Sequence, residues 1–103
     1  MNFQNLITRI KNLTSKDKKT ITQRLTKLAE ETGELAKEIN IIDEAPGCTY
    51  RDTNPEDALE EACDVIIVAS SILCHLDYNE EEFENMMNKK LDKWADVLTR
   101  DKK

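Results

Sequence analysis

The run from Asn54 to Leu76, NPEDALEEACDVIIVASSILCHL, is the most informative segment of this chain for its architecture. Asn54 can cap a helix, and Pro55 suits the first helical position because its missing N–H would have no partner there. Beyond Asp64 the apolar residues cover nearly every side of a helical wheel, which predicts a central helix buried on most sides. A short buried strand over the β-branched residues 65–68 is an alternative that periodicity does not exclude.

Helical spacing of apolar residues continues on both sides of this run. A stripe in a predominantly polar segment predicts a helix over roughly residues 16–42. Similar patterns predict a first helix that carries Phe3 and stops near Thr14 and Ser15, and a last helix that begins after Asn79, whereas residues 43–53, with proline and glycine, are predicted to form a loop. We therefore expect an all-α fold, a small helical bundle of about four helices in a single domain over residues 1–103, completed by oligomerisation.

The composition is typical of a soluble, helix-rich protein whose task is not to grip nucleic acid. Of 103 residues, 35% are charged, and the formal net charge of -6 argues against the basic surface that a nucleic-acid polymer requires. The longest apolar run is far too short to span a bilayer, and the N-terminal residues lack the pattern of a signal peptide. The three cysteines favour neither a disulfide framework nor a zinc site, so we expect a cytoplasmic protein without a membrane partner.

Two pairs of acidic residues stand out because helical spacing places the members of each pair on one face of a helix. Glu31 and Glu34 are three residues apart in one predicted helix, and Glu61 and Asp64 have the same spacing in the next. In an antiparallel hairpin the two pairs could meet, and four converging carboxylates need a hard divalent cation such as Mg2+. Asp64 also lies one turn before Val68 in an apolar segment, where an ionised carboxylate requires compensation.

The same spacing recurs in other acid pairs of this acid-rich chain, so spacing alone does not establish a site. The four carboxylates could be solvated, or they could pair with Lys27, Lys37 or Lys90, as most charge clusters in helical proteins do. Gly33 lies between the two glutamates of the first pair. It is interpreted either as a position where another backbone or a ligand approaches closely, or as a tolerated glycine.

The acidic segments resemble the motifs of a known enzyme family. LAEETGEL, residues 28–35, and EEACDVI, residues 60–66, look like the EExxE and ExxD motifs of MazG-like nucleoside triphosphate pyrophosphohydrolases, which are all-α NTP pyrophosphatases. A later segment, NKKLDK at residues 88–93, is similar to the Asn-x-Lys-aromatic-x-x-Arg pattern of the family. It departs from that pattern where Leu91 replaces the aromatic residue and Lys93 replaces the arginine.

This resemblance implies an enzyme that uses Mg2+, with Mn2+ as an alternative. The implied reaction cleaves the α-β phosphoanhydride of an NTP or dNTP to give a nucleoside monophosphate and pyrophosphate. Carried onto this chain, the motifs imply that Glu31, Glu34, Glu61 and Asp64 bind the metal. Glu30 would complete a second metal site or deprotonate the attacking water, and its alternative is a plain surface glutamate.

The resemblance also implies contacts with the substrate and with other copies of the chain. Asn88 would make a polar contact, and Lys90 and Lys93 would neutralise phosphate oxygens, although a solvated basic stripe is the alternative for these residues. The family commonly forms dimers or dimers of dimers, so we expect a homodimer or a homotetramer. The acidic motifs do not name the nucleobase or the sugar.

Other classes of protein remain open. A non-catalytic helical module, which dimerises or seats a partner helix, would explain the apolar stripes without any dependence on metal. A di-iron bundle expects Glu-x-x-His pairs, but Ile72 stands three residues before His75, which is interpreted as a helix-end residue. Cys63 and Cys74 lie in the segment that is predicted to be buried, and they are interpreted as core cysteines rather than nucleophiles.

Overall fold

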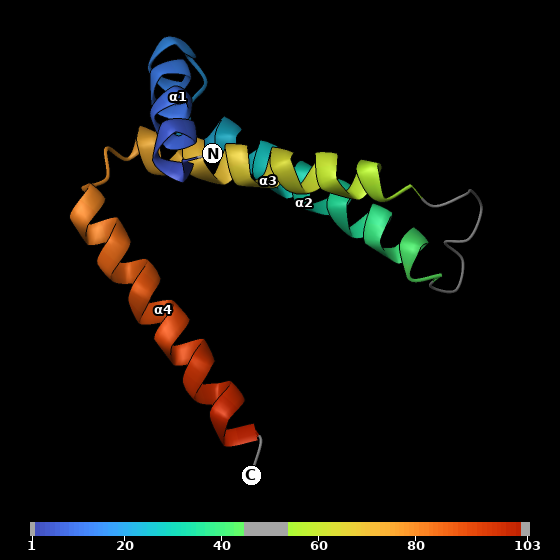
Figure 1. Cartoon of the computed structure of the whole chain (residues 1–103). Coiled ribbons are helices and arrows are strands. Elements are labelled where there is room, and N and C mark those ends of the chain that lie inside the picture. Colours follow the sequence, from blue (N-terminus) through green and yellow to red (C-terminus); the bar gives the residue numbers. More distant parts are fainter. Residues whose placement is uncertain (1, 45–53, 102–103) are drawn as a thin grey trace.

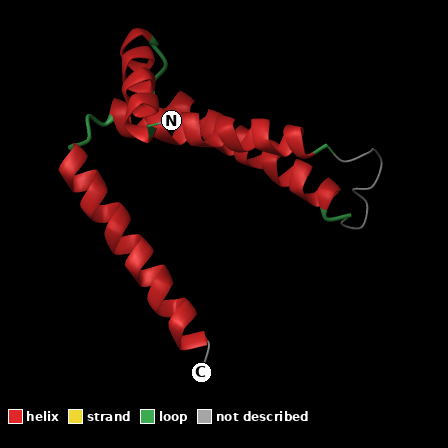
Figure 2. Ribbon diagram, viewed as in Figure 1, coloured by secondary structure: helices red, strands yellow, loops and turns green. Residues whose placement is uncertain are grey.

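The computed structural model describes residues 2–44 and 54–101, which form an all-α fold of four helices (Figures 1 and 2). The helices are α1 (Phe3–Lys16), α2 (Ile21–Ile42), α3 (Pro55–His75) and α4 (Glu80–Asp101). The predicted all-α class is confirmed. The alternative of a strand over residues 65–68 is wrong, because these residues lie inside α3. Most of the predicted loop, residues 45–53, lies outside the described residues.

α2 and α3 lie side by side as a long hairpin, and α1 packs across α3 near the end where α4 begins (Figure 1). The chain runs out along α2 and returns along α3, so the first turns of α3 lie beside the last turns of α2. We call the side of the hairpin on which α1 stands its upper face, and the opposite side its underside. α4 leaves on the underside.

Side-chain caps set the starts of the helices. Thr20 Oγ1 accepts the backbone N–H of Gln23 at 3.1 Å, and Gln23 Oε1 accepts the N–H of Thr20 at 2.8 Å. This reciprocal capping box starts α2 at Ile21, so the sequence-based start of this helix was too early. The side chain of Asn54 accepts a backbone N–H of the first turn of α3 at 3.0 Å, which confirms its predicted capping role, and Asn79 caps α4 in the same way.

The side chain of Arg24 links the end of α1, the start of α2 and the end of α3. The residue is 4% exposed. Its Nε donates to His75 Nδ1 at 3.3 Å, its Nη2 donates to the backbone carbonyl of Asp17 at 3.1 Å, and its Nη1 lies 4.0 Å from the Asp17 carboxylate. Because Asp17 follows α1, Arg24 belongs to α2 and His75 ends α3, one side chain ties the three helices together. The interpretation of His75 as a helix-end residue is confirmed.

The described chain buries few large apolar side chains. Ile7 in α1 and Ile41 in α2 are the hydrophobic residues that count as buried among those described. The prediction that α3 is buried on most sides is wrong for a single chain, since Ile66 is 53% exposed and Ile67 is 49% exposed. The reason is that α2 covers one side of α3 and α1 covers only part of another.

α4 stands apart from the other helices. No Cα atom of α4 comes within 8 Å of a Cα atom of α1, α2 or α3. At its start, Gln4 Nε2 donates to Glu80 Oε1 at 3.1 Å, and the rings of Tyr78 and Phe83 pack with their centroids 5.3 Å apart. Asp77, with φ of 54°, adopts the left-handed conformation that turns the chain from α3 toward α4.

Candidate metal centre

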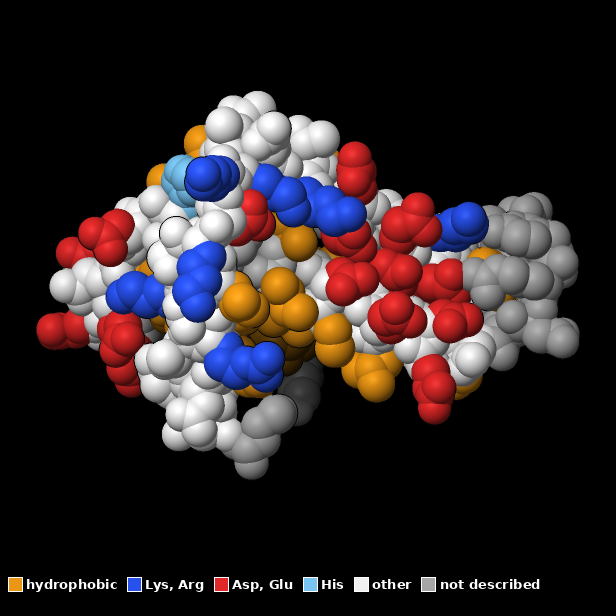
Figure 3. Space-filling view, turned by 90° about the horizontal axis from the view of Figure 1, so that it is seen from above, with side chains coloured by type: hydrophobic (Ala, Val, Ile, Leu, Met, Phe, Trp, Pro, Cys, Tyr) orange, Lys and Arg blue, Asp and Glu red, His pale blue; other side chains and the backbone are white. Residues whose placement is uncertain are grey.

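Three carboxylates from two helices meet on the upper face of the hairpin. One carboxylate oxygen each of Glu31 in α2 and of Glu61 and Asp64 in α3 lie within 4.8 Å of one another. All three residues are partly buried. Figure 3, which looks down on the upper face, shows acidic side chains gathered beside a hydrophobic patch. We refer to Glu31, Glu61 and Asp64 as the acid cluster.

Lys27 supplies a positive charge at one edge of the acid cluster. Its Nζ lies 2.9 Å from Glu31 Oε1, one helical turn away, and 3.9 Å from Glu30 Oε2. The hydrogen bond from Lys27 lowers the pKa of Glu31 below its ordinary value of 4.5, and the same contact raises the pKa of Lys27. The alternative in which the four carboxylates pair with lysines is thus confirmed for Glu31, through Lys27.

The pKa of Glu61 is shifted in the opposite direction to that of Glu31. Its pKa is raised above 4.5, chiefly because the carboxyl group is partly desolvated and then because the negative charges of Glu31 and Asp64 repel its ionised form. Glu34 contributes to the same repulsion. The cluster therefore concentrates more negative charge than Lys27 offsets, and a divalent cation would relieve this excess.

The remaining predicted acidic site residues lie at the margin of the acid cluster. Glu34 is exposed and does not belong to the group of converging oxygens, so the structure brings together three of the four predicted metal ligands. The side chain of Glu30 is 63% exposed and is held only loosely by Lys27. Glu30 is thus placed near the cluster, on its solvent side.

The predicted substrate contacts lie on a different part of the molecule. Asn88, Lys90 and Lys93 are exposed residues of α4, and α4 does not approach α2 or α3. A single chain therefore does not bring these three side chains to the acid cluster.

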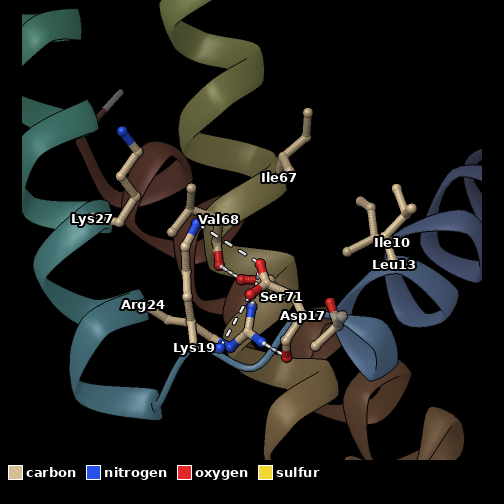
Figure 4. A pocket seen from close by; sticks show the side chains of 10 residues that line it. Ile10, Leu13, Asp17, Lys19, Arg24, Lys27, Ile67, Val68 and Ser71 are labelled. Atoms are coloured by element: carbon tan, nitrogen blue, oxygen red, sulfur yellow. Dashed lines mark hydrogen bonds and ion pairs between the residues drawn. The ribbon is translucent and has the colours of Figure 1, made fainter.

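A cavity of about 190 Å³ opens beside the acid cluster, between α1 and the hairpin (Figure 4). The side chains of Ile10 and Leu13 face those of Ile67 and Val68 across it, and Lys27 forms part of its wall. The other lining residues are polar: Thr14, Asp17, Lys19, Arg24 and Ser71. Sequence reasoning did not find this cavity, because it depends on how α1 crosses α3, which no local pattern encodes.

The cysteines do not form a second site with the acid cluster. Cys63 is exposed, so its interpretation as a core residue is wrong: it lies on the side of α3 that α2 does not cover. Cys74 is partly buried, and burial raises the pKa of its thiol, which keeps it protonated and poorly nucleophilic.

Within the described chain, each helix falls short of the length and apolarity that a membrane crossing demands.

The donor set of the acid cluster fits a hard divalent cation. All three side chains offer carboxylate oxygens, the ligands typical of Mg2+, Mn2+ and Ca2+, and none offers the sulfur or imidazole that softer ions prefer. Their partial exposure leaves room for water or phosphate oxygens.

Comparison with known proteins found no matching family model, no matching curated protein and no matching solved structure.

Proposed function

We propose that this protein is a Mg2+-dependent nucleoside triphosphate pyrophosphohydrolase, similar to the MazG-like enzymes. It hydrolyses an NTP or dNTP to the monophosphate and pyrophosphate in the cytoplasm, and it acts as a homodimer or homotetramer. The observation that carries the proposal is the convergence of Glu31, Glu61 and Asp64 within 4.8 Å, with only Lys27 paired to them among the described residues.

The motifs and the geometry support the proposal independently. The residues of the acid cluster come from the two segments that resemble the EExxE and ExxD motifs of the family. Their separation around one point suits an ion that takes a few carboxylates and completes its shell with water and phosphate oxygens.

Each residue of the site has a distinct role in the proposed reaction. When held at the acid cluster, Mg2+ would supply neutralising charge for the phosphate oxygens and would lower the pKa of a nearby water. Glu31, Glu61 and Asp64 hold the ion, and Glu34 adds negative charge at its edge. Glu30, on the solvent side, takes the proton from the attacking water. Lys27, beside Glu31, is positioned to contact a phosphate oxygen when the triphosphate enters.

The cavity beside the acid cluster gives the nucleoside a place to bind. Its apolar walls suit a nucleobase, and polar groups such as Ser71 and Asp17 offer hydrogen bonds that could select one base over another. Lys27 lines the cavity and also contacts Glu31, so the nucleoside and the triphosphate would occupy adjoining regions.

The second candidate is a non-catalytic helical interaction module. The observation that favours it is the large apolar surface of the chain, which includes Ile66 and Ile67 on α3 and Trp94 on α4. Such a module explains the apolar surface but gives no reason for three carboxylates to converge, so it predicts that Mg2+ leaves the protein unchanged.

A product analysis tests the proposal. The purified chain is incubated with a panel of NTPs and dNTPs and Mg2+, and chromatography separates monophosphates from diphosphates. We expect monophosphate and pyrophosphate from at least one nucleotide, and loss of turnover in Asp64→Asn. Glu60→Gln is the matched control, since it removes an exposed carboxylate adjacent to the acid cluster but outside it. Absence of monophosphate across the panel, or full activity in Asp64→Asn, would contradict the proposal.

A further inference from the structure

Another cavity, of about 300 Å³, lies where α1 meets the start of α4. Its lining comes from the first turns of α1, from the turn that follows α3 and from the first turns of α4. It shares no lining residue with the cavity beside the acid cluster and contains no member of that cluster. We call it the junction cavity.

Side chains alone bridge the junction cavity, because the backbones of α1 and α4 stay apart. No Cα atom of α4 comes within 8 Å of a Cα atom of α1, although α1 begins at the end of the molecule from which α4 leaves (Figure 1). The hydrogen bond from Gln4 Nε2 to Glu80 Oε1, at 3.1 Å, joins the two walls. The rest of the space between the helices is open to a small molecule.

Three aromatic rings line the junction cavity. Tyr78 and Phe83 pack with their centroids 5.3 Å apart and their planes tilted by 58°, and Phe3, which is 57% exposed, belongs to the opposite wall on α1. The face of an aromatic ring carries partial negative charge, which attracts a cation that lies within about 6 Å of the ring centroid. Rings from both walls can therefore contact the same cation.

The charged side chains of the junction cavity are all negative. Glu80 and Glu84 lie one turn apart on α4, so they share a face of this helix. Among the described residues, no lysine, arginine or histidine lines the cavity, and the amide of Gln4 leaves the charge of Glu80 uncompensated. The pKa of Tyr78 is raised above its ordinary value of 10.0, chiefly by burial, so the phenol stays neutral. The lining thus favours a positively charged ligand.

We propose that the junction cavity binds a small organic cation, a quaternary ammonium ion whose methyl groups contact the rings of Phe3, Tyr78 and Phe83. A primary ammonium has three N–H groups to satisfy, and a hard metal ion takes about six oxygen ligands, whereas this cavity offers two carboxylates and aromatic walls. A quaternary ammonium has no N–H group, and its methyl groups place the charge against the ring faces. The inference does not rest on the proposed hydrolysis.

The first test uses tetramethylammonium and choline as probes for the full chain. Calorimetric titrations are made at constant ionic strength, which is held with sodium chloride. We expect saturable binding with a dissociation constant on the order of 1–10 mM, as suits so small a ligand. The neutral alcohol in which carbon replaces the nitrogen of choline should bind at least about tenfold more weakly than choline. Absence of saturable binding, or equal affinities for choline and the alcohol, would overturn the proposal.

The second test locates the site with paired variants of ring residues on α4. Phe83→Leu should weaken choline binding at least about fivefold, because leucine fills space but has no ring face, and Phe83→Tyr should retain binding. Trp94→Leu is the matched control, since Trp94 is an exposed aromatic residue of α4 that does not line the cavity. Equal losses in Phe83→Leu and Trp94→Leu would place the cation elsewhere and refute the assignment.

The contribution of charge is tested in the same way. Glu84→Gln should weaken choline binding at least about twofold, whereas Glu81→Gln, which alters an exposed residue outside the cavity, should not. Because Glu84 is exposed, this pair also tests the site if Phe83→Leu fails to fold. Identical affinities in the two glutamine variants would contradict the proposal.

Hydrogen exchange tests whether one cation contacts both walls. A ligand that connects α1 to α4 should slow amide exchange in the first turns of α4, and unchanged exchange at saturating choline would count against the proposal. A second copy of the chain is the other possible occupant. If choline does not bind and Phe83→Leu lowers the mass measured by light scattering, the cavity is filled by another chain and the proposal is wrong.

Discussion

The Lys27 ammonium lies 2.9 Å from a carboxylate oxygen of Glu31, one turn along the same helix. This contact lowers the pKa of Glu31, whereas the pKa of Glu61, whose oxygen is within 4.8 Å of that of Glu31, is raised. Lysine therefore compensates one member of the acid cluster and leaves the others to repel each other. The predictions below follow from this imbalance and from the packing around it.

Removal of the Lys27 charge should strengthen metal binding. In Lys27→Gln no ammonium competes for Glu31 or repels an incoming cation, and the interaction of solvent-exposed charges is worth at most about 1 kcal/mol. We expect the affinity for Mg2+ to rise about fivefold, as measured by calorimetry or by thermal shift. Lys37→Gln, on the same helix but without a contact to the cluster among the described residues, should leave the affinity unchanged. Weaker binding in Lys27→Gln would show that the metal does not use Glu31.

Mg2+ should stabilise the folded protein through the acid cluster. For a dissociation constant of about 1 mM, about 10 mM Mg2+ adds about 1.4 kcal/mol to the free energy of unfolding. Asp64→Asn should lose most of this increment and Glu60→Gln should keep it, when urea unfolding is followed with and without Mg2+ at matched ionic strength. An increment that survives Asp64→Asn would mean that Mg2+ acts elsewhere on the protein.

The raised pKa of Glu61 predicts a pH dependence with a definite sign. The folded state binds the Glu61 proton more tightly than the unfolded chain does, so this contribution to stability is present below pH 4.5 and is lost as the pH rises through the raised pKa. Glu31, whose pKa is lowered, acts in the opposite direction.

A comparison of the wild type with Glu61→Gln isolates this effect, because glutamine resembles the protonated acid and does not titrate. Without divalent ions, the wild type should lose stability relative to Glu61→Gln as the pH rises above 4.5, in urea unfolding at a series of pH values. Saturating Mg2+ should reverse the trend. A difference that is independent of pH would exclude charge repulsion at Glu61.

Arg24 should be the most sensitive polar position of the fold. Arg24→Leu removes the donors to His75 and to the Asp17 carbonyl and should lower the free energy of unfolding by about 2–4 kcal/mol. Arg24→Lys should restore little of the loss, because an ammonium does not reproduce the planar fork of the guanidinium. Lys19→Ala, which alters a largely exposed neighbour, should change stability by less than about 0.5 kcal/mol. Full rescue by lysine would indicate that charge alone matters here.

Gly33 should tolerate a side chain. A Cβ at this position meets no other atom within 4 Å in the described structure, apart from its own helix backbone. Gly33→Ala should therefore raise the free energy of unfolding by about 0.5–1 kcal/mol, because the unfolded chain loses more freedom than the folded one. The same variant tests whether a ligand or a second copy approaches Gly33: hydrolysis and association should be unchanged, and a loss of either would favour close approach.

The sequence was a good guide to the helices because their signals are local. Capping side chains and apolar spacing act within a few residues, and Asn54 and Asn79 cap the helices that they were expected to cap. The start of α2 was placed too early because residues 16–19 include three lysines, which favour helix. In the structure Lys16 ends α1, and the reciprocal bonds of Thr20 and Gln23 start α2 at Ile21.

The acid cluster was only partly predictable. Spacing correctly placed Glu31, Glu61 and Asp64 on facing sides of two helices, but it could not show that Glu34 would turn toward solvent. The burial of side chains was harder to predict than the positions of the acidic residues. Ile66 and Cys63 were expected to be buried, but both are exposed in the described chain. The apolar pattern of a helix indicates that it is covered, but it does not say whether the cover comes from the same chain or from another copy.

Because the described chain leaves many of its large apolar side chains exposed, its stability is expected to depend on protein concentration. If a second copy covers the exposed apolar side chains, as the proposed homodimer or homotetramer requires, association contributes to the free energy of folding, and the unfolding midpoint should rise with the logarithm of protein concentration. Dilution alone would then lower the stability of the folded protein.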